Sequence, residues 1–307
     1  MQIADIPRAR RGVEWPTAAL AAFIYGSWFA TTYFYRALPV WSLPLIGGWI
    51  VAWQLSLQHE ILHGHPTRSR RINTAIAIWP LSLWLPYETY RLSHLRHHND
   101  TRLTDPLEDP ESNYWTPEQW ASAGPIVRAL VYAQETLLGR ILVGPAYAMG
   151  RFWEGQIKAM LAGDRVTQRI VLRHGLEAAI VVAWIVGVCH MPLWLYFFAY
   201  AYVGTALVRV RSYAEHRADN EVEHRTAIVE DSWVLGPLFL FNNLHVAHHL
   251  RASLPWYELP GWYRRNRDTL IALNGGLVYK TYFDVARRFL FRPHDTLFHP
   301  GPNWRAP

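Results

Sequence analysis

The sequence predicts an all-α integral membrane protein with four transmembrane helices in two hairpins and a helical cap on the cytoplasmic side. Three observations support this fold class. Hydrophobic residues make up 51% of the 307 residues and aromatic residues 14%, and tryptophan and tyrosine favour membrane–water interfaces. Four apolar runs approach the ~20 residues that a helix needs to cross a bilayer. Arginines cluster at one end of every run, which predicts a common orientation.

The four apolar runs pair into two hairpins. The first pair covers residues 17–37 and 40–58, and the second covers residues 170–189 and 191–208. Each link is short and a proline lies at or beside it (Pro39 and Pro192), so the two helices of a pair are expected to be antiparallel neighbours.

The arginines beside the runs predict the topology. They lie before the first and third runs and after the second and fourth: Arg8, Arg10, Arg11, Arg68, Arg70, Arg71, Arg165, Arg169, Arg173, Arg209, Arg211 and Arg217. Under the positive-inside rule, both termini and the polar loops are cytoplasmic, in the inner (cell) membrane if the chain is bacterial. Because the basic residues adjoin apolar runs, the net charge of +6 favours a membrane surface over nucleic acid as the partner.

The rest of the composition predicts one domain over residues 1–307. No internal repeat or flexible linker interrupts the chain, and the shorter apolar stretches 72–86 and 126–149 are predicted to be interfacial helices. Cys189 is the one cysteine, which excludes a disulfide framework, a cysteine zinc site and an iron–sulfur cluster.

The 15 histidines predict a metal site, because most of them form clusters with spacings of three and four. Such spacings place side chains on one helical face, and by the predicted topology all the clusters are cytoplasmic. They comprise His59 and His63; His94, His97 and His98; and His245, His248 and His249, with His216 after the fourth run. A lone histidine at a membrane boundary is usually a polar interfacial residue. Packed imidazoles without a metal, however, would leave many donors unpaired.

The number of histidines predicts two metal ions. An all-imidazole shell suits Fe, Zn, Cu or Ni rather than Mg or Ca. One zinc takes about four ligands, so eight or more histidines indicate a pair of ions.

The three boxes in this order resemble the membrane fatty acid desaturase superfamily, which also includes acyl and alkane hydroxylases and carotenoid ketolases and hydroxylases. The resemblance covers residues 40–260 and includes the run Leu254-Pro255-Trp256-Tyr257-Glu258-Leu259-Pro260. It implies two iron ions that use O2 as co-substrate to remove hydrogen from an unactivated C–H bond. The ligands that it implies are His59, His63, His94, His97, His98, His216, His245, His248 and His249.

The resemblance also predicts groups around the ligands. Members of the stearoyl type use an asparagine one turn before the extra histidine to hold a metal through water, whereas this chain has Ser212 there. Asn242 or Asn243 could take that role. Hydrogen-bonding partners orient metal-bound imidazoles, and the carboxylates expected to do so are Glu60, Asp100, Asp105 and Glu215.

The predicted activity is desaturation of a lipid acyl chain. Hydroxylation or ketolation of a lipid, alkane or carotenoid is the alternative, because both reactions begin with the same hydrogen abstraction. The sequence contains no haem segment, cysteine cluster or glycine-rich dinucleotide loop. An external ferredoxin, rubredoxin or cytochrome, with its reductase, is therefore expected to supply electrons.

Three other functions fit parts of the pattern. His59-Glu60-Ile61-Leu62-His63 matches the H-E-x-x-H motif of zinc peptidases, which would suggest an intramembrane protease but leaves the other two boxes without a role. A carboxylate-rich di-iron bundle built on Glu60-x-x-His63 and Glu221-x-x-His224 would need further inward glutamates. A metal transporter would carry its ligands near mid-membrane, whereas the clusters here are predicted to lie at one face of the membrane.

Overall fold

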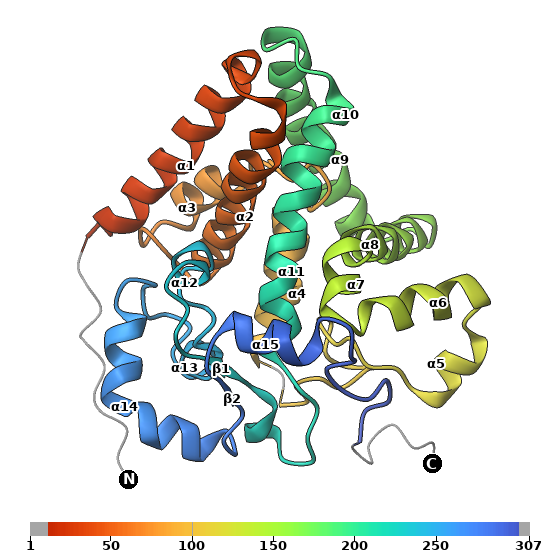
Figure 1. Cartoon of the computed structure of the whole chain (residues 1–307). Helices are drawn as coiled ribbons and strands as arrows, with labels where there is room; N and C mark the ends of the chain where they lie inside the picture. The colour runs from red at the N-terminus through yellow and green to blue at the C-terminus, as the bar shows by residue number, and fades with distance from the viewer. Residues whose placement is uncertain (1–11, 100, 301–307) are drawn as a thin grey trace. The chain divides into compact units, whose positions relative to one another are not determined.

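The structure is a computed structural model that describes residues 12–99 and 101–300. These residues fold mainly into helices, with one short two-stranded parallel sheet (Figure 1). Arg8, Arg10, Arg11 and Asp100, which the sequence analysis singled out, lie outside the described residues.

The bounds of the elements are as follows. The α-helices are α1 (Trp15–Tyr33), α2 (Leu43–Leu62), α3 (Arg70–Ala77), α4 (Tyr87–Asn99), α5 (Pro117–Ser122), α6 (Pro125–Gln134), α7 (Leu137–Leu142), α8 (Gly144–Leu161), α9 (Arg165–Val182), α10 (Leu193–Tyr196), α11 (Val203–Glu215), α12 (Leu235–Leu238), α13 (His245–Leu250), α14 (Leu259–Leu273) and α15 (Tyr282–Phe289). The 3₁₀ turns are η1 (Tyr35–Ala37), η2 (Val40–Ser42) and η5 (Val222–Arg225), and the π-helical segments are η3 (Ala183–Val188) and η4 (Phe197–Tyr202). The strands β1 (Ile228–Val229) and β2 (Val278–Tyr279) pair in parallel.

The contacts divide the described residues into two compact units. Unit 1 contains residues 93–144 and 209–300, and unit 2 contains residues 12–92 and 145–208. Each unit therefore combines segments that are distant in the sequence. The single domain over residues 1–307 stays a prediction.

Within the part of the chain that the structure describes, three helical stretches are long and apolar enough to cross a membrane: Val40–Leu62, Arg165–Val188 and Leu193–Glu215. They contain the second, third and fourth predicted runs almost entirely. The second of these stretches begins before the predicted residue 170 because the side chain of Asp164 accepts hydrogen bonds from the Val166 and Thr167 N–H groups and caps the helix.

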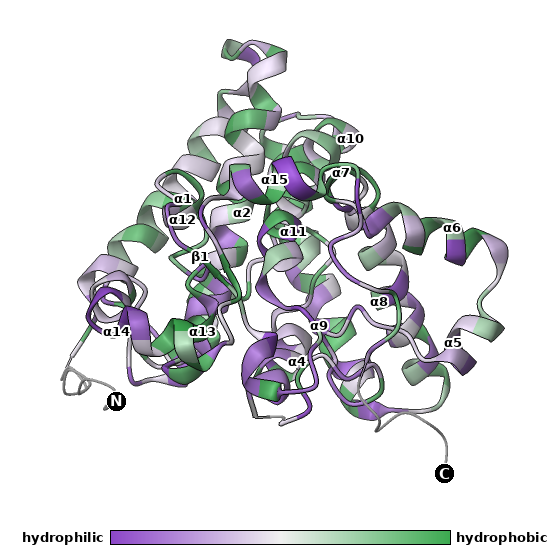
Figure 2. Ribbon diagram, turned by 60° about the horizontal axis from the view of Figure 1, so that its bottom comes forward, coloured by the Kyte–Doolittle hydropathy of each residue, from purple (hydrophilic) through white to green (hydrophobic). Residues whose placement is uncertain are grey.

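The first predicted span, residues 17–37, corresponds largely to α1. Its 19 residues contain no charged side chain, and purple is sparse along α1 in Figure 2. It contains several threonine, tyrosine and tryptophan residues, and it is not among the three stretches named above. A fourth span stays a prediction, as does the cytoplasmic position of the cap.

Glycines allow close helix packing within unit 2. A methyl group added at Gly47 of α2 would lie 2.4 Å from the Tyr200 ring, and one at Gly204 of α11 would lie 2.6 Å from the Val51 side chain. Such close approach is typical of small residues between membrane helices. Glycine at these positions therefore sets the distance between α2 and the η4–α11 segment.

Buried aromatic side chains also tie α1 into unit 2. Trp28 Nε1 donates a hydrogen bond to the Tyr196 hydroxyl (2.9 Å), which in turn donates to the Leu81 carbonyl (2.7 Å). Trp184 Nε1 donates to Thr32 Oγ1 (3.0 Å). Buried indole N–H and phenol groups need such partners, so these bonds fix α1 against the rest of the unit.

In unit 1, a hydrophobic core lies behind the short helix α13. Val246 and Ala247 of α13 pack with Trp262 and Leu270 of α14 and with Ile228 of β1, all of them buried. Because α13 has only six residues, this packing, rather than helix propensity, must hold it in place.

Candidate metal centre

Seven of the nine predicted ligands come together within unit 1, from three segments of the chain. Helix α4 carries the second box, α13 carries the third, and His216 follows the last residue of α11. The imidazoles form two groups, in each of which the ligand nitrogens lie within 4.8 Å of one another. We call them the His97 group (His97, His216, His245 and His249) and the His94 group (His94, His98 and His248).

Carboxylates orient two imidazoles of the second box. His94 Nδ1 lies 2.8 Å from Glu111 Oε1, and His97 Nδ1 lies 2.8 Å from Asp109 Oδ1. A carboxylate accepts, so Nδ1–H donates, and in the neutral form of each ring Nε2 carries the lone pair. The Asp109 side chain is itself fixed, because it also accepts hydrogen bonds from the backbone N–H groups of Thr104 and Glu111, each at 2.8 Å.

Two further imidazoles are oriented in the same sense by other acceptors. His216 Nδ1 donates to the Arg225 carbonyl (3.2 Å), and His245 Nδ1 donates to Asn242 Oδ1 (3.1 Å). Asn242 in turn donates to Glu215 Oε1 at 3.1 Å. The Nδ1 bonds again leave Nε2 as the acceptor nitrogen of each ring.

These acceptor nitrogens point at one another. His245 Nε2 lies 2.9 Å from His216 Nε2 and 3.1 Å from His249 Nε2. His97 Nε2 is buried and has no hydrogen-bond partner among residues 12–99 and 101–300. Lone pairs at this separation repel one another unless a cation lies between them, and ligand nitrogens about 2.1 Å from one metal are spaced by roughly 3 Å. The His97 group therefore has the geometry of a metal site.

Electrostatics keeps most of this group in the neutral form that binds metals. Burial, followed by repulsion from His97, lowers the pKa of His216 to about 3. Burial and the neighbouring imidazoles lower the pKa values of His245 and His249 well below the usual range. A proton shared between their Nε2 atoms is thus disfavoured at neutral pH, which leaves a metal ion as the cation that fits.

His97 behaves differently because carboxylates surround it. Burial disfavours its charged form, but the Glu111 and Asp109 carboxylates outweigh burial and raise its pKa to about 9. The pKa of Glu111 is lowered in return, chiefly by His94 and His97 acting against burial. Binding a metal through His97 would accordingly release a proton.

The His94 group lies beside the His97 group. His248 Nε2 and His98 Nε2 are 3.0 Å apart, and burial together with His94 and His97 lowers the pKa of His98 to about 2. The ring of His98 stacks on that of His249, with centroids 4.2 Å apart. The two groups are therefore adjacent, as a pair of metal ions requires.

The first box belongs to unit 2. His59 lies in the last turn of α2, and His63 follows the end of that helix, with ring centroids 5.1 Å apart. Their participation in metal binding stays a prediction.

The side chains that were predicted to orient or supplement the metal ligands differ in what they contact. Glu215 and Asn242 contact His245, with Glu215 Oε1 at 3.4 Å from His245 Nδ1. Asn243 instead donates to the Val229 carbonyl, and Ser212 donates to the Arg209 carbonyl. Glu60 lies in unit 2, with Oε1 3.7 Å from His65 Nε2.

Two carboxylates that contact ligands, Asp109 and Glu111, were not predicted from the sequence. They reach His97 and His94, whereas the predicted Asp105 accepts from the backbone N–H groups of Leu107 and Glu108. The available signal was the acidic segment after the second box, but only the fold shows which of its carboxylates faces an imidazole.

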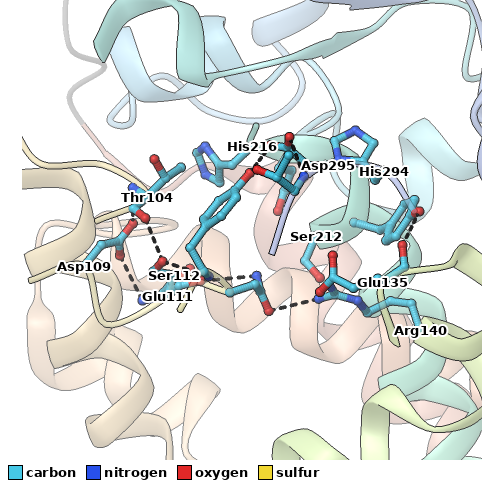
Figure 3. A pocket seen from close by; sticks show the side chains of 15 residues that line it. Thr104, Asp109, Glu111, Ser112, Glu135, Arg140, Ser212, His216, His294 and Asp295 are labelled. Atoms are coloured by element: carbon cyan, nitrogen blue, oxygen red, sulfur yellow. Dashed lines mark hydrogen bonds between the residues drawn. The ribbon is translucent and has the colours of Figure 1, made fainter. Parts of the chain in front are cut away.

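A polar pocket opens beside the His97 group in unit 1. His216, Asp109 and Glu111 line one part of it, and Glu135 and Arg140 line another (Figure 3). Burial raises the pKa of Glu135 to about 7, against the effect of Arg140. With this lining, the pocket suits water or a small polar ligand rather than a methylene chain.

Comparison with known proteins agrees with this geometry. The chain matches the fatty acid desaturase family over residues 35–282, a range that contains all three boxes and His216. A search of curated proteins finds no match. The family and the histidine clusters together indicate an oxidoreductase of the di-iron desaturase or hydroxylase type, and the three apolar helices indicate a membrane protein. The matched range is most of the sequence, and the chain belongs to the fatty acid desaturase family.

Proposed function

We propose that this protein is an O2-dependent di-iron oxidoreductase that introduces a carbon–carbon double bond into a lipid acyl chain. The observation that carries the proposal is the convergence of the acceptor nitrogens of His216, His245 and His249. Family membership supplies the reaction class.

The ligand set of the proposal follows the two groups of unit 1. The His97 group would hold one iron. The His94 group, completed by His59 and His63, would hold the other. The four-residue spacing of His59 and His63 at the end of α2 supports their inclusion, because both rings lie on one side of that helix end. Bound iron would supply the activation of O2 that side chains cannot perform.

The residues of the chain perform the remaining tasks. Asp109 and Glu111 hold the rings of His97 and His94 in the tautomer that offers Nε2. Desaturation removes two hydrogen atoms from neighbouring methylenes, and O2 is reduced to two waters with two further electrons and two protons. An external ferredoxin, rubredoxin or cytochrome, with its reductase, would supply those electrons.

The proposed placement follows from the apolar helices and the arginines. Spans that include Val40–Leu62, Arg165–Val188 and Leu193–Glu215, together with α1, would place both termini and the histidines on the cytoplasmic side. The Glu60 carboxylate lies near the His65 imidazole. The match to an oxidoreductase family favours iron-binding histidines in the first box over a zinc peptidase motif.

The test is expression of the full chain and of His97→Ala and His248→Ala variants in a host with a suitable electron donor. Mass spectrometry of the lipids should show O2-dependent loss of two hydrogens with the wild type. Both variants should lose turnover and bound iron, while His224→Ala, a histidine outside the boxes, should keep both. Iron and activity persisting together in the two variants would refute the proposal. Gain of an oxygen atom instead would establish the hydroxylase alternative.

A further inference from the structure

The segment at the end of the described chain, residues 290–299, lies against the acidic loop that follows the second box, within unit 1. Trp115 N–H of this loop donates to the Leu297 carbonyl at 3.1 Å. The Tyr114 hydroxyl donates to Asp295 Oδ2 at 2.5 Å. The end segment is therefore bonded to the same loop that carries the two carboxylates of the metal centre.

One histidine of the end segment reaches deeper into this loop. His299 Nε2 and Thr104 Oγ1 form a hydrogen bond of 2.9 Å between residues that are 195 positions apart in the sequence. Both residues are buried, with exposed fractions of 3% and 2%. His299 is not one of the nine proposed iron ligands, so its burial needs another explanation.

Thr104 has an unusual backbone conformation. Its φ is 69°, in the left-handed region that a β-branched residue rarely adopts. Such a conformation persists only where the surrounding contacts enforce it. Here the Thr104 N–H donates to Asp109 Oδ2 (2.8 Å), the Thr104 carbonyl accepts from the Ser112 hydroxyl (2.7 Å), and the Thr104 hydroxyl is bonded to His299 (Figure 3 draws the first two bonds).

The conformation of Thr104 bears on a metal ligand. Its N–H fixes one oxygen of Asp109, and the other oxygen accepts from His97 Nδ1 at 2.8 Å. A continuous series of hydrogen bonds thus leads from His299 through Thr104 and Asp109 to His97. If Thr104 relaxed to an ordinary φ, its N–H would turn away from Asp109, and the carboxylate that orients the imidazole would lose a donor that holds it.

The neighbouring residue connects the same turn to a second ligand. The Leu103 carbonyl accepts from Arg225 Nη1 at 2.7 Å. The carbonyl of Arg225 is in turn the acceptor for His216 Nδ1 at 3.2 Å. The turn at residues 103–104 is therefore bonded to the groups that orient two imidazoles of the His97 group.

We propose that His299 is a positioning residue of the metal centre. It holds the left-handed turn at Thr104, and this turn aims Asp109 at His97. The proposal rests on the metal centre of the proposed function, although it does not depend on which reaction the centre catalyses.

The experiment follows a bound metal rather than turnover. Full-length protein in detergent is loaded with Co²⁺ in place of iron, because the visible absorption bands of Co²⁺ depend on ligand geometry, and the ion is then removed by graded chelator. His299→Ala should change the cobalt spectrum and release the metal at a lower chelator concentration than wild type. The shift should be smaller than the about 10–100-fold that is typical for a direct partner of a ligand. His299→Gln should restore both properties, because its amide can bond to the Thr104 hydroxyl.

Two further variants separate positioning from general loosening of the end segment. His294→Ala is the matched control, since it removes a comparable bond of the same segment, from His294 Nε2 to the Tyr279 hydroxyl at 2.7 Å. It should keep the wild-type cobalt spectrum. Thr104→Val keeps the side-chain shape but lacks the hydroxyl, so it should reproduce the effect of His299→Ala, and combining the two changes should add nothing.

The outcomes distinguish this proposal from the proposed function. A wild-type cobalt spectrum and chelator response in folded His299→Ala would overturn the positioning role alone, as would an equal spectral change in His294→Ala. If His299→Ala does not fold, Thr104→Val decides by the same two measurements. Failure of the wild type to bind Co²⁺ or iron would refute the metal centre, and the positioning role with it.

Discussion

Replacing Asp109 by asparagine should weaken metal binding at the His97 group. Asp109 Oδ1 accepts from His97 Nδ1 and Glu111 N–H, and Oδ2 accepts from Thr104 N–H, all at 2.8 Å. An asparagine has one acceptor oxygen, so its NH2 group must face at least one of these donors. The buried donor left without an acceptor costs about 1–3 kcal/mol of stability.

The effect on metal affinity follows from the same geometry. Loss of a partner that orients a ligand typically costs about 10–100-fold in metal affinity, or about 1.4–2.7 kcal/mol. The Asp109→Asn variant should therefore release its iron at a chelator concentration about 10–100-fold lower than wild type. Dialysis against graded chelator followed by iron analysis measures this shift.

Asp105→Asn is the matched control. Asp105 is equally buried and four residues away, but Oδ1 accepts from the N–H groups of Leu107 and Glu108, a role that the asparagine oxygen can keep. Its iron affinity should stay near that of wild type. Wild-type iron affinity in Asp109→Asn, or an equal loss of iron affinity in Asp105→Asn, would refute this role of Asp109.

Three further changes test other parts of the structure. Burial lowers the pKa of His294 to about 4, below the usual value near 6.5, so the unfolded chain binds more protons between these pH values. Stability should fall by up to about 3 kcal/mol as pH drops from 6.5 to 4, and the His294→Gln variant should lack this part of the pH dependence in thermal unfolding. Gly204→Ala should lower the melting temperature, because its methyl group would lie 2.6 Å from Val51 and such overpacking costs about 1–3 kcal/mol of stability. Gly175→Ala should not lower the melting temperature, because its methyl group would face open space. Trp262→Ala should cost about 3–5 kcal/mol and also lower bound iron, since Trp262 supports α13; undiminished iron would show that α13 does not need this core.

Much of the site was predictable because helical spacing is local. The spacings of three and four residues that identified the second and third boxes also place side chains on one side of a helix. Accordingly, one side of α4 carries His94, His97 and His98, and one side of α13 carries His245, His248 and His249. The apolar runs were predictable in the same way, since residues 40–58 contain no charged side chain before His59. The predicted helix starts were less accurate, because a cap such as Asp164 depends on the conformation of one side chain.

The sequence by itself determined the family, the apolar helices and the identity of the clustered histidines. Only the tertiary structure decided that His248 meets His98, 150 residues away, and that Asp109 rather than Asp105 faces His97. Spacing along a helix fixes directions within one element, whereas contacts between elements depend on how loops close and cores pack. A metal site needs atoms placed within a few tenths of an ångström, and that precision comes from packing between segments that no local pattern encodes.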